Sequence, residues 1–255
     1  MSVSVVIPNH NHGETLELAI VSAYCQGPLE VVVIDDASTD GSVNIARQWQ
    51  SISSGGVRLV ANTTKADNWQ EAMAREFPAL RGETVVFCAA DDMLLPGMIA
   101  HAREHAAAPV VFTDYHCLDG RQLLPGVSQS VTETTKLTDD EVRQRIRSNT
   151  NATETGIGSA IHLKHLEWLA SLQFWRCGPF GDAIGYAAVA ALHGAVYLPG
   201  SGAAIRVNPQ SYGRAMAADD EQRRHYKAES IAFLRKAGVD DETARRLIEK
   251  RCGPQ

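Results

Sequence analysis

The first 115 residues alternate short, continuous apolar runs with longer segments of helical spacing, and this alternation constrains the fold more than any other feature. Helical spacing is clear in residues 13–26, where Leu16, Ile20 and Ala23 fall on one side. The apolar runs predict five strands, at residues 3–8, 29–36, 57–62, 83–90 and 109–115. Repeated β-α-β units with continuously apolar strands are typical of an α/β, Rossmann-like fold, in which helices cover both faces of a mostly parallel central sheet.

The second half of the chain is less regular, but it shows no internal repeat, linker or low-complexity tract. Residues 117–136 are polar and predict a loop or hairpin, and the chain closes with two amphipathic helices that each begin with acidic residues. Between residue 136 and these closing helices we expect helices at 137–148 and 181–195, a strand and helix within 156–172, and strands at 196–200 and 202–207. We therefore expect a single domain over residues 1–255.

Charge and cysteine content narrow the class of protein. The net charge of −6 argues against broad affinity for nucleic acid. No apolar run approaches the ~20 residues of a membrane-spanning helix, and no basic region precedes the first apolar run as in a signal peptide. The five cysteines are widely spaced and include no Cys-x-x-Cys pair, so neither a disulfide framework nor a zinc site is indicated. A cytoplasmic protein is the expectation.

Polar residues follow three of the predicted strands, as "PNHN" at 8–11, "DDAS" at 35–38 and "ADD" at 90–92. Parallel neighbouring strands bring such ends to one edge of the sheet. Adjacent carboxylates repel each other, so at the end of a buried strand they need a cation, a hydrogen-bonding ligand or water. Either pair alone is most simply a helix cap or a turn. Two pairs at equivalent strand ends favour a site for a hydroxyl-bearing ligand and a bound cation.

These segments resemble the inverting family-two nucleotide-sugar glycosyltransferases of GT-A type. "SVVIPNHNHGETLELAIVSAYCQ" and "EVVVIDDASTDGS" are similar to the family's first two strand–helix units, and "GETVVFCAADDMLLPG" to its fourth strand with an Asp-x-Asp-Asp ending. The resemblance is strong over residues 3–113 and fainter to about 212. It implies a nucleotide-binding half at 1–113, an acceptor-binding half at 114–215 and C-terminal helices at 216–255.

The resemblance also implies roles for individual residues at the strand ends. Asp36 accepts a hydrogen bond from the base, and His10 stands where an aromatic ring usually stacks on uracil. The nucleotide or its diphosphate is then bordered by Pro8, Asn9, His10, Asp36, Lys65, Asn68, Ala90 and Asp91.

A divalent cation, Mn²⁺ or Mg²⁺, is implied by the same comparison, because hard oxygen ligands suit these ions. Asp91 is its expected ligand, Asp92 is the second acid of the pair, and Asn208 occupies the position of a histidine often found near the metal. Asn208 is equally well explained as a turn residue before Pro209. Ala89 departs from the family, which often has an aspartate at that position.

An inverting transfer needs a general base, and "FGDAIGYAAVAALHG" resembles the segment that supplies it, with Asp182 as the base. The simpler explanation of Asp182 is a helix N-cap. Glu154 is a weaker candidate. Gly158 and Ser159 resemble a small-residue strand that approaches the donor or acceptor sugar.

Several alternatives remain open from the sequence. Arg206 either neutralises phosphate or forms a surface ion pair. A nucleotidyltransferase is disfavoured, because the loop after the first strand has one glycine and no following basic residue. A catalytically degenerate relative that binds a nucleotide sugar or a partner protein is the main alternative to a glycosyltransferase of glycan biosynthesis. The sugar is not specified, and the acceptor is a glycan, a lipid-linked molecule or a small molecule.

Overall fold

The computed structural model describes residues 1–120, 122–126, 131–148, 158–207 and 219–252. The strands in this part of the chain are β1 (Val3–Asn9), β2 (Glu30–Asp35), β3 (Val57–Ala61), β4 (Thr84–Phe87), β5 (Met93–Leu94), β6 (Val110–Asp119), β7 (Gln122–Pro125), β8 (Thr135–Leu137), β9 (Ser159–His162) and β10 (Ala195–Arg206). The helices are α1 (Leu16–Tyr24), α2 (Ser42–Ile52), α3 (Trp69–Ala74), α4 (Met98–Glu104), α5 (Asp139–Arg147), α6 (Leu163–Ser171), α7 (Gly181–His193), α9 (Asp220–Ala237) and α10 (Asp241–Cys252), with 3₁₀ turns η1 (Phe77–Ala79) and η2 (Phe174–Phe180).

All of these strands join one sheet, whose main path runs β3-β2-β1-β4-β9-β6-β10-β5. Strands β1 to β4 are parallel neighbours, and β6 and β10 run in the same direction as they do. Strand β9 is antiparallel and lies between β4 and β6. The α/β class with mostly parallel strands is confirmed, and the fifth predicted strand is separated from the fourth by this insertion.

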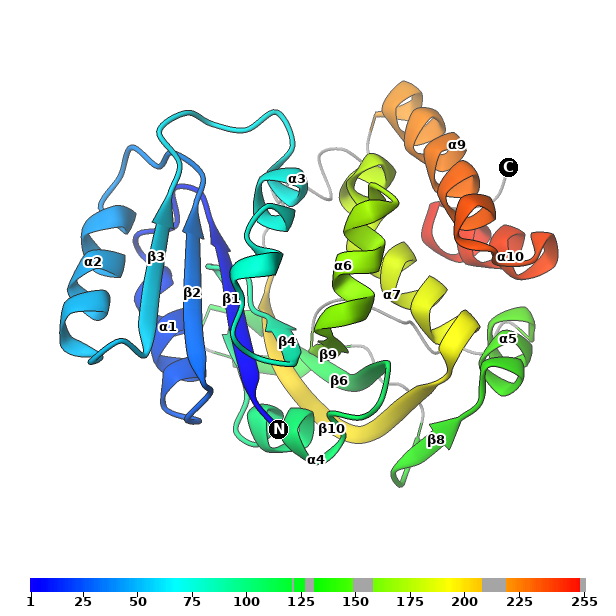
Figure 1. Ribbon diagram of the computed structural model, residues 1–255, viewed down its shortest axis with the longest axis horizontal. Helices are drawn as coiled ribbons and strands as arrows, with labels where there is room; N and C mark the ends of the chain where they lie inside the picture. The colour runs from blue at the N-terminus through cyan, green and yellow to red at the C-terminus, as the bar shows by residue number, and fades with distance from the viewer. Residues whose placement is uncertain (121, 127–130, 149–157, 208–218, 253–255) are drawn as a thin grey trace.

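Two apolar cores lie on the two faces of the sheet, because successive side chains of a strand point to opposite faces. Val3, Val5 and Ile7 of β1 pack toward α1, α2 and α4, whereas Val6 packs toward the core that contains α3, α5, α6, α7, α9 and α10. Figure 1 shows α1 and α2 at one end of the sheet and α9 and α10 at the other. No helix in the described ranges is long and apolar enough to cross a membrane.

Two predicted elements differ from the observed ones. The helical segment between the third and fourth predicted strands forms only the short helix α3, because Asn68 caps α3 at Trp69 and Pro78 lies in the 3₁₀ turn η1. The two strands expected at 196–200 and 202–207 form the single strand β10, whose register to β6 shifts between Tyr197 and Ala203. Pro199 lies in this irregular stretch, where its missing N–H breaks no regular pairing.

Candidate nucleotide-binding site at the carboxyl ends of the strands

The ends of β1 and β2 are tied together by side-chain hydrogen bonds. Asn9 is 3% exposed, and its Nδ2 donates to Asp35 Oδ2 at 2.7 Å and to Ser38 Oγ at 3.1 Å. The second oxygen of Asp35 accepts from the Ser38 amide at 2.9 Å. Asn9 and Asp35 therefore fix the shape of the loop after β2, and the Asn9 side-chain nitrogen is engaged by the protein itself.

His10 is held in one orientation beside this loop. Its Nδ1 lies 2.8 Å from the carbonyl oxygen of Asp36, and because a carbonyl only accepts, Nδ1 carries the proton and donates. The side-chain Nδ2 of Asn11 lies 3.3 Å from Nε2, which is then the acceptor. The half-buried ring, with both nitrogens engaged, therefore keeps a fixed plane.

The Asp36 carboxylate joins β2 to the loop that follows β3. Asp36 is 6% exposed, and its Oδ1 accepts from the Ala66 amide at 2.9 Å and from Asn62 Nδ2 at 3.1 Å. Lys65, the neighbour of Ala66, is exposed at the same place. The structure thus brings Asp36 and Lys65 together, although 29 positions separate them in the sequence.

Asn68 ends this loop and is occupied by protein contacts. Its Oδ1 accepts from the amides of Gln70 and Glu71, at 2.9 and 3.2 Å, and its Nδ2 donates to the Trp175 carbonyl at 3.1 Å. The side chain caps α3 and connects it to the turn η2.

The two aspartates after β4 have different surroundings. Asp91 is half-buried at the edge of the sheet, whereas Asp92 is 5% exposed and its Oδ1 accepts from the Arg206 amide at 2.8 Å. Burial and the charge of Asp91 raise the pKa of Asp92 to about 7, although the Arg206 amide and guanidinium oppose the rise. Arg206 Nε donates to the Asp91 carbonyl at 3.0 Å. Asp92 therefore anchors the end of β10, and Asp91 is the acid available to a ligand.

Main-chain contacts bring the three strand ends together. The Ala90 amide donates to the Pro8 carbonyl at 3.3 Å, and the Asp36 amide donates to the Asn9 carbonyl at 2.8 Å. Strand β1 lies between β2 and β4, so the chain extends the sheet first on one side of β1 and later on the other. The carboxyl end of β1 is therefore the topological switch point, where open α/β sheets generally bind ligands.

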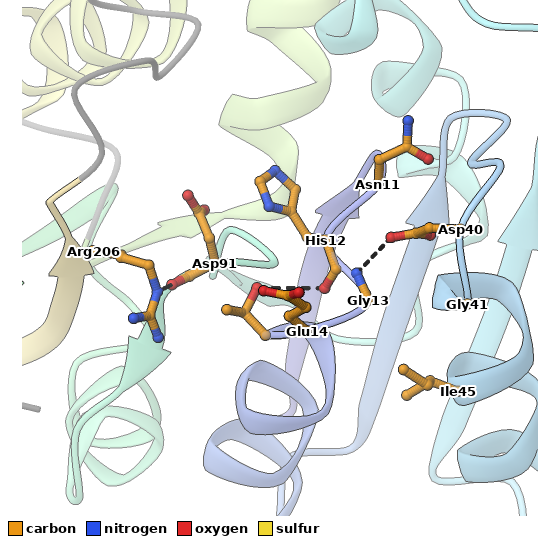
Figure 2. Close-up of a pocket in the computed structure, with 10 residues that line it drawn as sticks. Asn11, His12, Gly13, Glu14, Asp40, Gly41, Ile45, Asp91 and Arg206 are labelled. Carbon is orange, nitrogen blue, oxygen red and sulfur yellow. Dashed lines mark hydrogen bonds between the residues drawn. The ribbon is translucent and has the colours of Figure 1, made fainter. Parts of the chain in front are cut away.

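A pocket of about 420 Å³ opens beside Asp91 and Arg206 (Figure 2). Figure 2 shows these two residues on one side of it and Asp40, Gly41 and Ile45 on the other. The residues at the start of α1, from Asn11 to Thr15, complete the lining. Apart from Asn11, these lining residues before α1 and Asp40 were not singled out from the sequence. Their signal was present in "STDGS", because Asp40 Oδ2 accepts from the Gly13 amide at 2.8 Å and joins the two helix starts.

Gly158 and Ser159 lie where β9 begins. Gly158 has a φ of +64°, and its carbonyl accepts from Thr113 Oγ1 at 2.5 Å. A Cβ atom at Gly158 would lie 3.0 Å from the same Oγ1, so this close approach and backbone conformation favour glycine. Ser159 is fully buried opposite Phe112 of β6.

Asp182 is the second residue of α7 and is half-buried. One turn later, the buried Tyr186 ring lies 6.5 Å from the ring of Phe87, at the carboxyl end of β4. Burial and the nearby charge of Asp182 raise the pKa of Tyr186 well above its usual value. Asp182 therefore lies at the same end of the sheet as Asp91. Asn208 and Glu154 lie outside the described residues.

Among the residues that the structure describes, no group of three or more histidine, cysteine, aspartate or glutamate side chains is placed to hold a metal ion. Asp91 lies at the pocket with the Arg206 guanidinium beside it, and the carboxylates of Glu14 and Asp40 line the same pocket. Such a site suits an ion that takes its remaining ligands from water and from substrate phosphates, as Mg²⁺ and related ions often do.

The protein is thus of the α/β class, with polar side chains gathered beyond the carboxyl ends of its parallel strands. The family model for glycosyl transferase family 2 matches residues 4–165. An uncharacterized glycosyltransferase of Nostoc sp. is 30% identical over 145 residues, which are 55% of this chain and 44% of that protein. The chain therefore spans less than half the length of this relative.

Solved structures with the same fold include glycosyltransferases of low sequence identity. S. aureus TarS in complex with UDP-GlcNAc superposes with a TM-score of 0.65 at 12% identity, over 98% of this chain and 71% of that one. The mannosyltransferase PcManGT from Pyrobaculum calidifontis, in complex with GDP-Man and Mn²⁺, gives 0.59 at 20% identity, over 96% and 73%. The chain belongs to glycosyl transferase family 2, and residues 4–165 carry its glycosyltransferase domain.

Proposed function

We propose that this protein transfers a sugar from a nucleoside-diphosphate sugar, specifically a UDP-sugar, to an acceptor hydroxyl with inversion at the anomeric carbon. One observation carries the proposal: the polar ends of β1, β2 and β4 converge at the switch point of a family 2 sheet, and Asp182 lies at the same end. The nucleotide sugars bound to TarS and PcManGT support it.

The base of the nucleotide is assigned to the β1–β2 side of the site. His10 presents a ring in a fixed plane, and the Asp36 carboxylate has acceptor capacity beyond the two bonds that Oδ1 receives. A uracil N–H can therefore be bound at Asp36 while the ring stacks on His10. Lys65 is placed to contribute positive charge near the nucleotide.

The diphosphate and its cation are assigned to the end of β4. Asp91 would hold a divalent cation, and the Arg206 guanidinium adds positive charge beside it. Bound there, the cation would stabilise the negative charge that develops on the leaving diphosphate. Asp92 helps to position Asp91 and Arg206, because its carboxylate accepts a hydrogen bond from the Arg206 amide. This bond holds the end of β10 against the turn that contains Asp91.

Asp182 is assigned as the general base. A carboxylate at this position can take the proton of the acceptor hydroxyl while the hydroxyl oxygen attacks the anomeric carbon and the diphosphate leaves from the opposite side. The half-buried position in the first turn of α7 keeps the carboxylate accessible to an acceptor.

A catalytically degenerate relative, which binds nucleotide sugar without transfer, is the second candidate. Ala89 favours it, since this half-buried position lacks the first acid of the resembled motif. Slow, Mn²⁺-dependent hydrolysis of a UDP-sugar to UDP would exclude this candidate.

The test measures UDP binding and UDP-sugar hydrolysis, with water in place of the unknown acceptor. We expect UDP to bind more tightly with Mn²⁺, Asp91→Asn to lose that Mn²⁺ dependence, and Asp182→Asn to keep UDP binding but lose at least about 100-fold in turnover. Glu167→Gln, which changes an exposed carboxylate on α6, is the matched control and should leave both unchanged. A folded protein that binds no UDP under either condition would refute the proposal.

A further inference from the structure

The segment that leads into Asp182 is the irregular turn η2, whose backbone conformation depends on contacts with neighbouring elements. Gln173, at its start, has a φ of +62°, and Gly178 inside it has φ +62° and ψ −135°, a combination that only glycine adopts readily. Pro179 follows, and it removes an N–H donor. A short 3₁₀ turn of this kind makes few good hydrogen bonds of its own, so neighbouring elements must hold its shape.

Helix α3 holds the turn from one side. Asn68 Nδ2 donates to the Trp175 carbonyl at 3.1 Å while its Oδ1 caps α3. Gln70, on the first turn of α3, packs directly against Gly181. A Cβ atom at Gly181 would lie 2.6 Å from Gln70 Oε1 and 2.9 Å from the Phe174 carbonyl oxygen, so α3 and the start of α7 are in close contact.

Helix α9 holds the turn through a second set of contacts. The ring of Tyr226 lies against Gly178 so closely that a Cβ atom there would overlap it. Glu229, one turn later, accepts a hydrogen bond from Arg176 Nη2 at 3.1 Å, and its second carboxylate oxygen forms an ion pair with Arg176 Nε at 2.8 Å. Two-point pairs of this kind fix relative orientation as well as adding energy. Figure 1 shows α9 far from β1 to β3, so it reaches the site through this turn.

We propose that Asn68 and Tyr226 are positioning residues for Asp182, and that α9 therefore contributes to catalysis by holding the turn that orients the base. The inference rests on the proposed function. A general base must lie within hydrogen-bond reach of the acceptor hydroxyl, and a displacement of about 1 Å lowers turnover by up to about 100-fold. Asn68 then acts on transfer through Trp175, and it does not act by contacting the nucleotide.

Asn68→Ser is the decisive variant. Serine keeps the N-cap of α3, but its shorter side chain does not reach the Trp175 carbonyl. We expect turnover of UDP-sugar to fall by about 10-fold or more, with the donor KM and UDP Kd within about 2-fold of the wild type. The midpoint of the acidic limb of kcat against pH should also move, because the surroundings of the base have changed.

Tyr226→Leu and Tyr226→Phe test the α9 side. The leucine variant removes the ring from Gly178 and should lower kcat in the same way, whereas phenylalanine keeps the ring and should restore it. Arg235→Gln is the matched control, since it breaks an exposed ion pair with Asp241 in the same helical hairpin away from the turn. Each assay is run well below the melting temperature of the variant concerned, so that partial unfolding does not enter.

The outcomes separate this inference from the proposed function. If Asp182→Asn is inactive but Asn68→Ser and Tyr226→Leu turn over like the wild type, the positioning role is wrong while the proposed function stands. A raised donor KM with unchanged kcat in Asn68→Ser would likewise overturn it and return Asn68 to the nucleotide. If Asp182→Asn keeps full turnover, the proposed base itself is wrong.

Discussion

A carboxylate is buried at the amino-terminal edge of the central sheet and another at its carboxyl-terminal edge. The surroundings of the two carboxylates shift their pKa values in opposite directions. At the amino-terminal edge, Glu30 is 1% exposed and accepts from Ser4 Oγ at 2.7 Å, from the Arg81 amide at 2.7 Å and from Arg81 Nε at 2.9 Å. Burial alone raises its pKa, yet these bonds outweigh burial, and the pKa of Glu30 lies below its usual value. At the carboxyl-terminal edge, the Arg206 amide is the backbone donor to Asp92, and Asp91 adds repulsion.

The difference distinguishes a carboxylate whose negative charge is compensated within the protein from carboxylates whose charge is compensated less. Glu30 has its donors within the protein, so its negative charge stabilises the fold. Asp92 and Asp91 share one end of the sheet with less compensation, and the pKa of Asp92 is raised to about 7 as a result. Uncompensated charge costs stability, and here it lies at the switch point of the sheet.

The largest expected effect is at the amino-terminal edge. Glu30→Ala leaves the buried Ser4 hydroxyl and the Arg81 amide without their acceptor, so we expect a loss of about 3 to 4 kcal/mol in the free energy of unfolding. Urea denaturation measures it. Glu71→Ala, which removes the exposed partner of Arg75, is the control and should cost less than about 1 kcal/mol. If Glu30→Ala lowers the free energy of unfolding no more than the control does, the proposed difference between the two edges is wrong.

A second prediction concerns pH at the same edge. His165 is 9% exposed, and its ring centroid lies 4.7 Å from that of His193. Burial, followed by the positive charges of His193, Lys164 and His162, lowers its pKa to about 4. The unfolded chain therefore binds the proton more readily between about pH 6.5 and pH 4, so the stability contributed by neutral His165 is complete above that range and is lost as the pH falls through it.

The expected loss is at most about 3 kcal/mol between these limits, measured as the free energy of unfolding against pH. Burial and the charge of Lys164 also lower the pKa values of His162 and His193, although Glu83 opposes the shift at His162 and Asp139 opposes it at His193. His165→Phe keeps an aromatic ring without a titrating group, so its stability should depend less on pH over this range. Equal slopes for the two proteins would show that His165 titrates normally.

The smallest expected effect is at the carboxyl-terminal edge. Asp92→Asn keeps an oxygen acceptor for the Arg206 amide and removes a buried charge beside Asp91. We expect the free energy of unfolding to stay the same or rise by about 1 kcal/mol. The same substitution at the other edge, Glu30→Gln, should instead be destabilising. Denaturation of the two variants side by side gives the comparison, and a large loss for Asp92→Asn would make both edges structural.

Much of the first half of the chain follows from local sequence. Continuous apolar runs such as those of β1 and β2 can be buried only in a sheet covered on both faces, so the α/β class and a mostly parallel sheet were predictable. The polar strand ends then had to meet at one edge, and the structure places Asp36 and Asp91 there. The resemblance to family-two enzymes, confirmed over residues 4–165, depends on the same strand ends.

Other features depend on contacts between segments distant in sequence, and periodicity carries no information about these. Asn68 resembled a nucleotide contact in the sequence, but the fold brings Trp175 to its amide, 107 positions away. The different surroundings of Asp91 and Asp92 depend on Arg206, more than 110 positions later. The sequence by itself therefore determined the sheet and the position of its charged ends. Only the tertiary structure decided which of those charges the protein neutralises itself, because neutralisation requires donors from elsewhere in the chain.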